Sequence, residues 1–194
     1  MTNHTITPEH IILTFEKESD HLYSLLATHP TLGTLFSNEK LPQTNTLKTA
    51  YSRWLKATHD YVTSTRKMLA ASADALQDGD PQDRSFSLAF QRYIQEETDP
   101  SDGQGHEYWA ANDLRALGSE QLLELPKHPA ILAYERFFVS DAKQHPYALF
   151  GSKGVLERLS IKAAPDLLLG LQMSNIKNIN SALQFISGHG ELDL

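Results

Sequence analysis

The chain has 194 residues, of which 40% are hydrophobic, and its formal net charge is −7. These values are ordinary for one soluble domain with a sizeable core, and we expect a single domain over residues 1–194. The negative charge, without any basic patch, argues against a nucleic-acid partner, and the absence of cysteine excludes disulfides, thiolate metal sites and cysteine nucleophiles.

The chain carries no segment that predicts membrane insertion or export. No apolar run approaches the roughly 18 residues that a membrane-spanning helix requires. The N-terminus also lacks the basic and apolar regions of a signal peptide. We therefore expect a cytoplasmic protein that does not bind membranes.

Apolar side chains recur three and four residues apart over nearly the whole chain, which is the pattern of amphipathic helices. A first helix is expected to begin at Thr7-Pro8-Glu9, where a capping residue precedes proline, and to end near Ala27. A second helix is expected from Thr46 to about Leu76, and a third from about Arg84 to Glu97.

The second half of the chain continues as helices separated by glycine and proline. One helix is expected from near Gly105 to Gly118, a short one over Ser119–Leu125, and another from Pro129 to about Gln144. Further helices are expected to begin after His145-Pro146 and at Pro165, and the last is expected to extend from Asn178 to Leu194. Gly151 and Gly154 predict a kink or a close helix contact. Because no strand-like alternation persists, we expect an all-α protein.

Histidine and carboxylate side chains suited to a metal ion occur in two clusters. His189 and Asp193 are four residues apart, so they share one face of the last helix. Upstream, Glu96 and Glu97 precede His106, and Glu157 lies between the two clusters. Such nitrogen and oxygen donors, directed inward from facing helices, are the ligands of iron and manganese in helical bundles.

The sequence leaves two questions about these ligands open: which glutamate of the pair Glu96 and Glu97 faces inward, and what neutralises Glu157. Helical phase places Glu97 on the same stripe as Phe86, Phe90 and Tyr93, which favours Glu97 over Glu96 as the inward-facing carboxylate. Glu157 lies in an apolar stretch, where a buried charge costs several kcal/mol without a partner. That partner is either a metal ion or a nearby cation, Arg158 or Lys162.

Other side chains are candidates for the wall of a substrate pocket. They are His59 and Tyr61 of the second helix, and Trp109, which shares a helix face with His106. A structural role is at least as common for a histidine or tryptophan in such positions. Asp113 is expected to pair with Arg66 or Arg115 rather than with a metal. The aromatic residues Tyr134, Phe137 and Phe138 are expected in the core.

The order of these motifs resembles that of the heme-oxygenase-like di-iron oxidases, from about Trp54 to the end of the chain. The segments that carry the resemblance are His59-Asp60-Tyr61-Val62, Glu96-Glu97 leading into His106-Glu107-Tyr108-Trp109, Val155-Leu156-Glu157, and His189-x-x-x-Asp193. Some relatives' spacing to the histidine corresponds to Glu96 instead of Glu97.

The resemblance implies a heme-oxygenase-like bundle of about seven helices that holds two iron ions, or iron with manganese at one position, and uses O₂ as co-substrate. The implied metal ligands are Glu97 or Glu96, His106, Glu157, His189 and Asp193. The family's last histidine ligand follows the aspartate by three residues. On this comparison the chain lacks the C-terminal end of the last helix.

These observations together predict a non-haem di-metal oxidase or oxygenase. Its partner would be a small organic substrate such as an amino-acid-like or fatty-acid-like molecule, and a homodimer is left open. Thiaminase-type proteins of the same fold depend on a cysteine nucleophile, which this chain lacks. The alternative is a non-enzymatic helical interaction protein with a vestigial or incomplete metal site.

Overall fold

The computed structural model describes residues 8–36, 43–98 and 105–192, and the regular structure in these residues is entirely helical. The α-helices are α1 (Pro8–Ala27), α2 (Thr44–Leu76), α3 (Pro81–Thr98), α4 (His106–Ala116), α5 (Pro129–Asp141), α6 (Ala148–Gln172) and α7 (Gln184–Leu192). Short 3₁₀ helices are η1 (Leu32–Phe36), η2 (Glu120–Glu124) and η3 (Ile179–Ser181). The described residues confirm an all-α protein of about seven helices.

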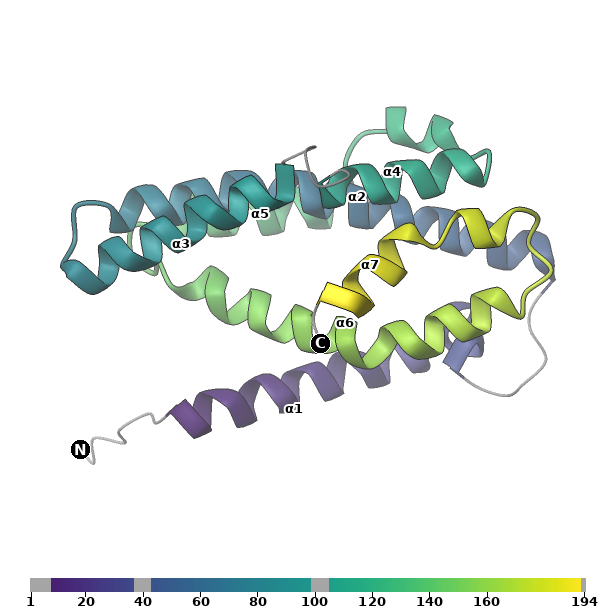
Figure 1. Cartoon of the computed structure of the whole chain (residues 1–194), viewed down its shortest axis with the longest axis horizontal. Helices are drawn as coiled ribbons and strands as arrows, with labels where there is room; N and C mark the ends of the chain where they lie inside the picture. The colour runs from purple at the N-terminus through teal and green to yellow at the C-terminus, as the bar shows by residue number, and fades with distance from the viewer. Residues whose placement is uncertain (1–7, 37–42, 99–104, 193–194) are drawn as a thin grey trace.

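The helices form two layers joined by the last one. The long helix α2 packs against α3, α4 and α5 in one layer, and α1 packs against α6 in the other. Figure 1 shows the first layer above the second, with α7 between them. Because α7 contacts both α4 and α6, it connects the two layers.

Local sequence signals explain several helix boundaries. Pro129 occupies the start of α5, and the Nδ1 atom of His128 accepts a hydrogen bond from the backbone N–H of Ala130. Gly118 ends α4 with a left-handed φ of 65°. The backbone N–H of Ser119 then donates to the carbonyl of Leu114 at 2.9 Å, which closes the helix as glycine-ended helices commonly do.

Two expected boundaries are wrong. Pro165 lies inside α6 and does not begin a new helix. Proline removes one backbone hydrogen bond, but the buried residues Ala164 and Leu167 beside it pack into the core, and the helix continues with a bend (Figure 1). The last helix begins at Gln184 and not at Asn178, because Asn178 adopts a left-handed φ of 64° and the chain first forms η3.

The two expected glycines of α6 lie at a close helix contact. A Cβ atom at Gly154 would be 2.4 Å from the ring of Phe15 in α1, so only glycine allows this approach. From this contact α1 continues along α6, where Asp20 pairs with Lys162 and the hydroxyl of Tyr23 donates to Asp166.

Two clusters of buried apolar side chains form the core. The larger joins the first half of α2 to α4, to the second half of α6 and to α7; the smaller joins the second half of α2 to α3 and α5. Tyr61 packs against both clusters. None of the described helices combines the length and apolarity needed to cross a membrane.

Candidate metal centre

A cavity of about 700 Å³ lies between the two helix layers. Its volume is within the range of small-molecule binding sites. Apolar and aromatic side chains from both layers form most of its wall; they include Leu22, Trp54, Tyr61, Val62, Tyr93, Ile131, Tyr134, Val155, Leu156, Leu159 and Phe185. The charged groups of the wall are Glu18, Glu97, Lys153 and Glu157.

Glu97 enters the cavity from the end of α3. Its side chain follows Tyr93 by one turn, so it continues the buried stripe of this helix. Glu97 is only 2% exposed, and its Oε2 atom lies 3.0 Å from Nδ1 of His106. Because His106 is the first residue of α4, the junction of α3 and α4 brings a carboxylate and an imidazole together at the cavity wall.

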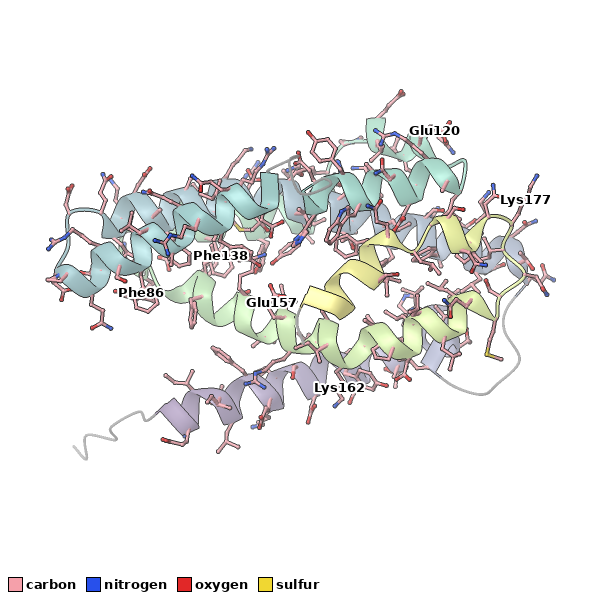
Figure 2. All side chains as sticks on the ribbon, viewed as in Figure 1. Phe86, Glu120, Phe138, Glu157, Lys162 and Lys177 are labelled. Atoms are coloured by element: carbon pink, nitrogen blue, oxygen red, sulfur yellow. The ribbon has the colours of Figure 1, made fainter. Side chains whose placement is uncertain are left out.

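Glu157 reaches the same cavity from α6. The hydroxyl of Tyr93 donates a hydrogen bond to its Oε1 atom at 2.8 Å. Figure 2 shows Glu157 on the side of α6 that faces the other layer.

The two cations that could have neutralised Glu157 bind α1 instead. Arg158 pairs with Glu16 at 3.6 Å, and Lys162 pairs with Asp20. The alternative of an ion pair between Glu157 and Arg158 or Lys162 is therefore not found among the ion pairs of the described residues.

Lys153 is a site residue that the sequence pattern did not reveal. It lies one turn before Glu157 on α6 and is 8% exposed. Its Nζ atom is 3.8 Å from Oε1 of Glu97 and 5.1 Å from the ring centres of both Tyr61 and Tyr93. Lysine is usually a surface residue, so only its place on the same helix face as Glu157 could have pointed to the cavity.

The tyrosines of the wall remain protonated around neutral pH. Burial raises the pKa of Tyr61 and of Tyr134 to about 12. Burial raises the pKa of Tyr93 further, and the charges of Glu157 and Glu97 add to the increase. These phenols can therefore donate hydrogen bonds to anions in the cavity.

The aromatic residues of α5 only partly follow the expectation of a core position. Phe138 is buried in the smaller core cluster, as expected. Tyr134 lines the cavity, where its hydroxyl is hydrogen-bonded to Ser152, and Phe137 is 56% exposed. Tyr134 and Phe138 are one turn apart on the same helix face, with ring centres 4.7 Å apart, whereas Phe137 differs from Phe138 by about 100° in direction and is exposed.

Of the predicted pocket residues, Tyr61 lines the cavity and His59 does not. The lining residues of α2 follow the helical spacing of Trp54, Thr58, Tyr61 and Val62, whereas His59 is two residues from Tyr61 and faces another direction. Its Nδ1 atom lies 3.6 Å from Asp60, and burial lowers the pKa of His59, although Asp60 opposes this decrease.

Trp109, the third predicted pocket residue, is not among the residues that line the cavity, but it packs beside His106. Its ring centre is 4.5 Å from that of His106, so it packs against the imidazole. A Cβ atom at Gly188 of α7 would lie 2.4 Å from the Trp109 ring. The glycine therefore allows α7 to approach α4 closely beside His106.

Asp113 has a role that sequence reasoning missed. Its Oδ1 and Oδ2 atoms accept hydrogen bonds from the backbone N–H groups of Gln184 at 3.0 Å and Phe185 at 2.9 Å. Asp113 thus caps the start of α7 from another helix. The expected partners are engaged elsewhere: Arg66 pairs with Glu107 at 3.3 Å, and Arg115 donates to Asn112.

The chain matches no family model, no curated protein and no solved structure. The resemblance to heme-oxygenase-like oxidases therefore stays a prediction. Any functional conclusion depends on the chemistry of the cavity itself.

Three predicted ligands cannot be placed. Asp193 and the side chains of Glu96 and His189 lie outside the described residues. The backbone of α7 carries position 189 one turn after Phe185, which lines the cavity. Within residues 8–36, 43–98 and 105–192, no group of three or more histidine, aspartate and glutamate side chains is close enough to hold a metal ion.

Proposed function

We propose that the chain is an O₂-dependent oxidoreductase that holds two iron ions, or one iron and one manganese ion, and oxidises a small organic substrate. One observation carries this proposal: two carboxylates from α3 and α6 line one largely apolar cavity, and one of them contacts an imidazole from α4. Glu157 is about 50 residues from His106 in the sequence, whereas Glu97 and His106 lie on either side of the junction of α3 and α4. Three such groups at one cavity indicate a metal site more specifically than any one of them alone.

The donor set suits the proposed metals. Glu97 and Glu157 would supply carboxylate oxygens and His106 would supply an imidazole nitrogen, which is the mixture that iron and manganese accept. The family resemblance assigns the remaining ligands to His189 and Asp193. The bound metal ions would supply the redox chemistry that activates O₂.

The chain's own residues would orient these ligands. The hydroxyl of Tyr93 holds Glu157 by a hydrogen bond, and Trp109 packs against the His106 ring. Such supporting contacts restrict the direction of metal ligands. Leu22, Val155 and the other apolar side chains of the wall would exclude water and bind the body of the substrate.

A metal-free helical interaction protein is the second candidate function. It is favoured by the contacts of Glu97, which lies 3.0 Å from His106 and 3.8 Å from Lys153. A buried carboxylate with two such neighbours is stabilised without a metal ion.

Anaerobic loading with Fe(II), followed by metal analysis, separates the two candidates. The oxidase is expected to retain about two iron ions per chain and to develop a transient visible absorption band on exposure to O₂. Glu157→Gln and His106→Ala should reduce the bound iron, whereas Glu120→Gln, an exposed residue of η2 (Figure 2), should not. Failure of the wild-type protein to retain iron would support the interaction protein.

A further inference from the structure

The ammonium group of Lys153 is buried in the cavity wall without a hydrogen-bond acceptor among the described residues. Its nearest carboxylate oxygen, Oε1 of Glu97, is 3.8 Å away, which exceeds hydrogen-bond distance. An ammonium has three N–H donors, and burying such a charge is costly unless these donors are satisfied. A molecule bound in the cavity could therefore supply the missing hydrogen-bond acceptor for this ammonium group.

The position of this ammonium is set by its surroundings. Its Nζ atom lies 5.1 Å from the ring centres of Tyr61 and Tyr93, and both distances are typical of cation–π contacts. Tyr61 belongs to α2 and Tyr93 to α3, so the other layer holds the end of this α6 side chain. Lys153 thus presents a positive charge at a defined point of the wall.

The charge balance of the cavity depends on whether metal is bound. The described wall carries three carboxylates, Glu18, Glu97 and Glu157, and a single cation, Lys153. Without metal, Lys153 is the counter-charge of Glu97. When Glu97 and Glu157 are engaged by metal ions, Lys153 would be left as a cation that faces an apolar cavity.

We propose that Lys153 binds the carboxylate of the substrate, and that the substrate class is a monocarboxylic acid with an apolar body. The inference rests on the proposed function, because metal binding is what frees Lys153 from Glu97. Leu22, Leu156 and Leu159 provide the apolar surface for the body of the acid. Ser152, next to Lys153 and also in the wall, shares one hydrogen bond with the Tyr134 hydroxyl, so the second O–H of this pair is a further donor that an acid could use.

The test compares three probes that share one hydrocarbon chain: octanoate, octanol and octylamine. Each is titrated anaerobically into Mn(II)-loaded protein by calorimetry and by tryptophan fluorescence, because Trp54 lines the cavity and the chain has only two tryptophans. Octanoate is expected to bind more tightly than octanol or octylamine. In Lys153→Met the affinity for octanoate should fall about tenfold or more, as for loss of a charge-assisted hydrogen bond, with octanol affinity unchanged.

Lys177→Met is the matched control, because this exposed lysine is also a single positive charge and lies far from Glu157 (Figure 2). It should bind octanoate like the wild type. Octanoate binding that is unchanged in Lys153→Met, or a wild-type protein that prefers octanol or octylamine or binds none of the probes, would overturn the assignment. If Lys153→Met does not fold, Lys153→Gln and the wild-type comparison of the three probes decide the question.

The bound Mn(II), measured on the same samples, separates this inference from the proposed function. Protein that retains neither Mn(II) nor Fe(II) overturns the proposed function, and the inference with it. If only Fe(II) is retained, the same titrations use the Fe(II)-loaded protein. Protein that binds Mn(II) but shows no preference for the acid overturns the role of Lys153 alone.

Discussion

Glu97 is the residue at which the groups of the site meet. Its carboxylate lies within 3.0 Å of His106 and 3.8 Å of Lys153, and the cavity that it lines also contains Glu157. The direction of Glu97 could be predicted from the sequence, because the apolar stripe of α3 continues through it. The role of Lys153 could not, because a lysine in a helix is normally assigned to the solvent-exposed face.

At the residue scale, the hydrogen bond from Tyr93 to Glu157 is open to a direct test. Tyr93→Phe removes the donor and leaves the ring, so Glu157 would lose its orientation without a change in packing. We expect the affinity for Fe(II) or Mn(II) to fall about tenfold, the size of effect seen when a supporting contact of a metal ligand is lost. A competition assay with a metal-binding dye measures this change.

Tyr147→Phe is the control for this experiment. The hydroxyl of Tyr147 is also bonded to a carboxylate, that of Asp83, but it lies outside the described cavity wall. Its removal should leave the metal affinity unaltered. Equal affinities in Tyr93→Phe and the wild type would show that the tyrosine does not support a metal ligand.

At the scale of the elements, α7 depends on a residue of another helix. Asp113 is fully buried in α4 and accepts the first two backbone N–H groups of α7. Asp113→Asn replaces one acceptor oxygen by an amide donor, which leaves a buried N–H without a partner. We expect the free energy of unfolding, measured in urea, to fall by about 1–3 kcal/mol.

Asp74→Asn, an exposed position of α2, is the comparison for this loss. It should change the free energy of unfolding by less than about 0.5 kcal/mol. Hydrogen exchange should also speed up at the amides of Gln184 and Phe185 in Asp113→Asn alone. Unchanged exchange there would contradict the capping role.

The same carboxyl group predicts a pH dependence. Burial raises the pKa of Asp113 to about 6 from an ordinary value of 3.8, although both hydrogen-bonded amides oppose the increase. The folded state therefore binds this proton more tightly than the unfolded state does. The contribution of the group to stability is present below about pH 4 and is lost as the pH rises through 6.

Urea unfolding between pH 4 and pH 7 measures this contribution. The difference in unfolding free energy between the wild type and Asp113→Asn should shift in favour of the variant as the pH rises. A difference that stays constant over this range would show that Asp113 titrates alike in both states.

The elements themselves could largely be predicted from the sequence, because helical periodicity and the caps around Pro129 and Gly118 are local signals. What the sequence did not reveal depends on tertiary contacts. Asp113 and Gln184 are far apart in the chain, so no local pattern relates them. Similarly, Pro165 would end an isolated helix, but packing of its neighbours carries α6 through it.

At the scale of the whole molecule, the proposed site joins the two layers. Glu97 and His106 belong to the layer of α2, whereas Glu157 belongs to α6 in the other layer. A metal ion bound by all three would oppose separation of the layers. Binding should therefore stabilise the entire fold.

Thermal unfolding with and without Mn(II) tests this coupling. Free metal at about 100 times its dissociation constant would add about 2.7 kcal/mol. For a chain of this length, that raises the melting temperature by about 5–10 °C. Glu157→Gln should lose most of the increase; an equal increase in this variant would place the metal elsewhere.

The most direct measurement is a crystal structure of the Fe(II)-loaded protein, with anomalous diffraction at the iron absorption edge. The proposed function predicts anomalous density inside the bundle, in contact with the Glu97 and Glu157 carboxylates and the His106 imidazole. Density confined to the protein surface, with Glu97 still beside Lys153 and Glu157 bound only by Tyr93, would contradict it.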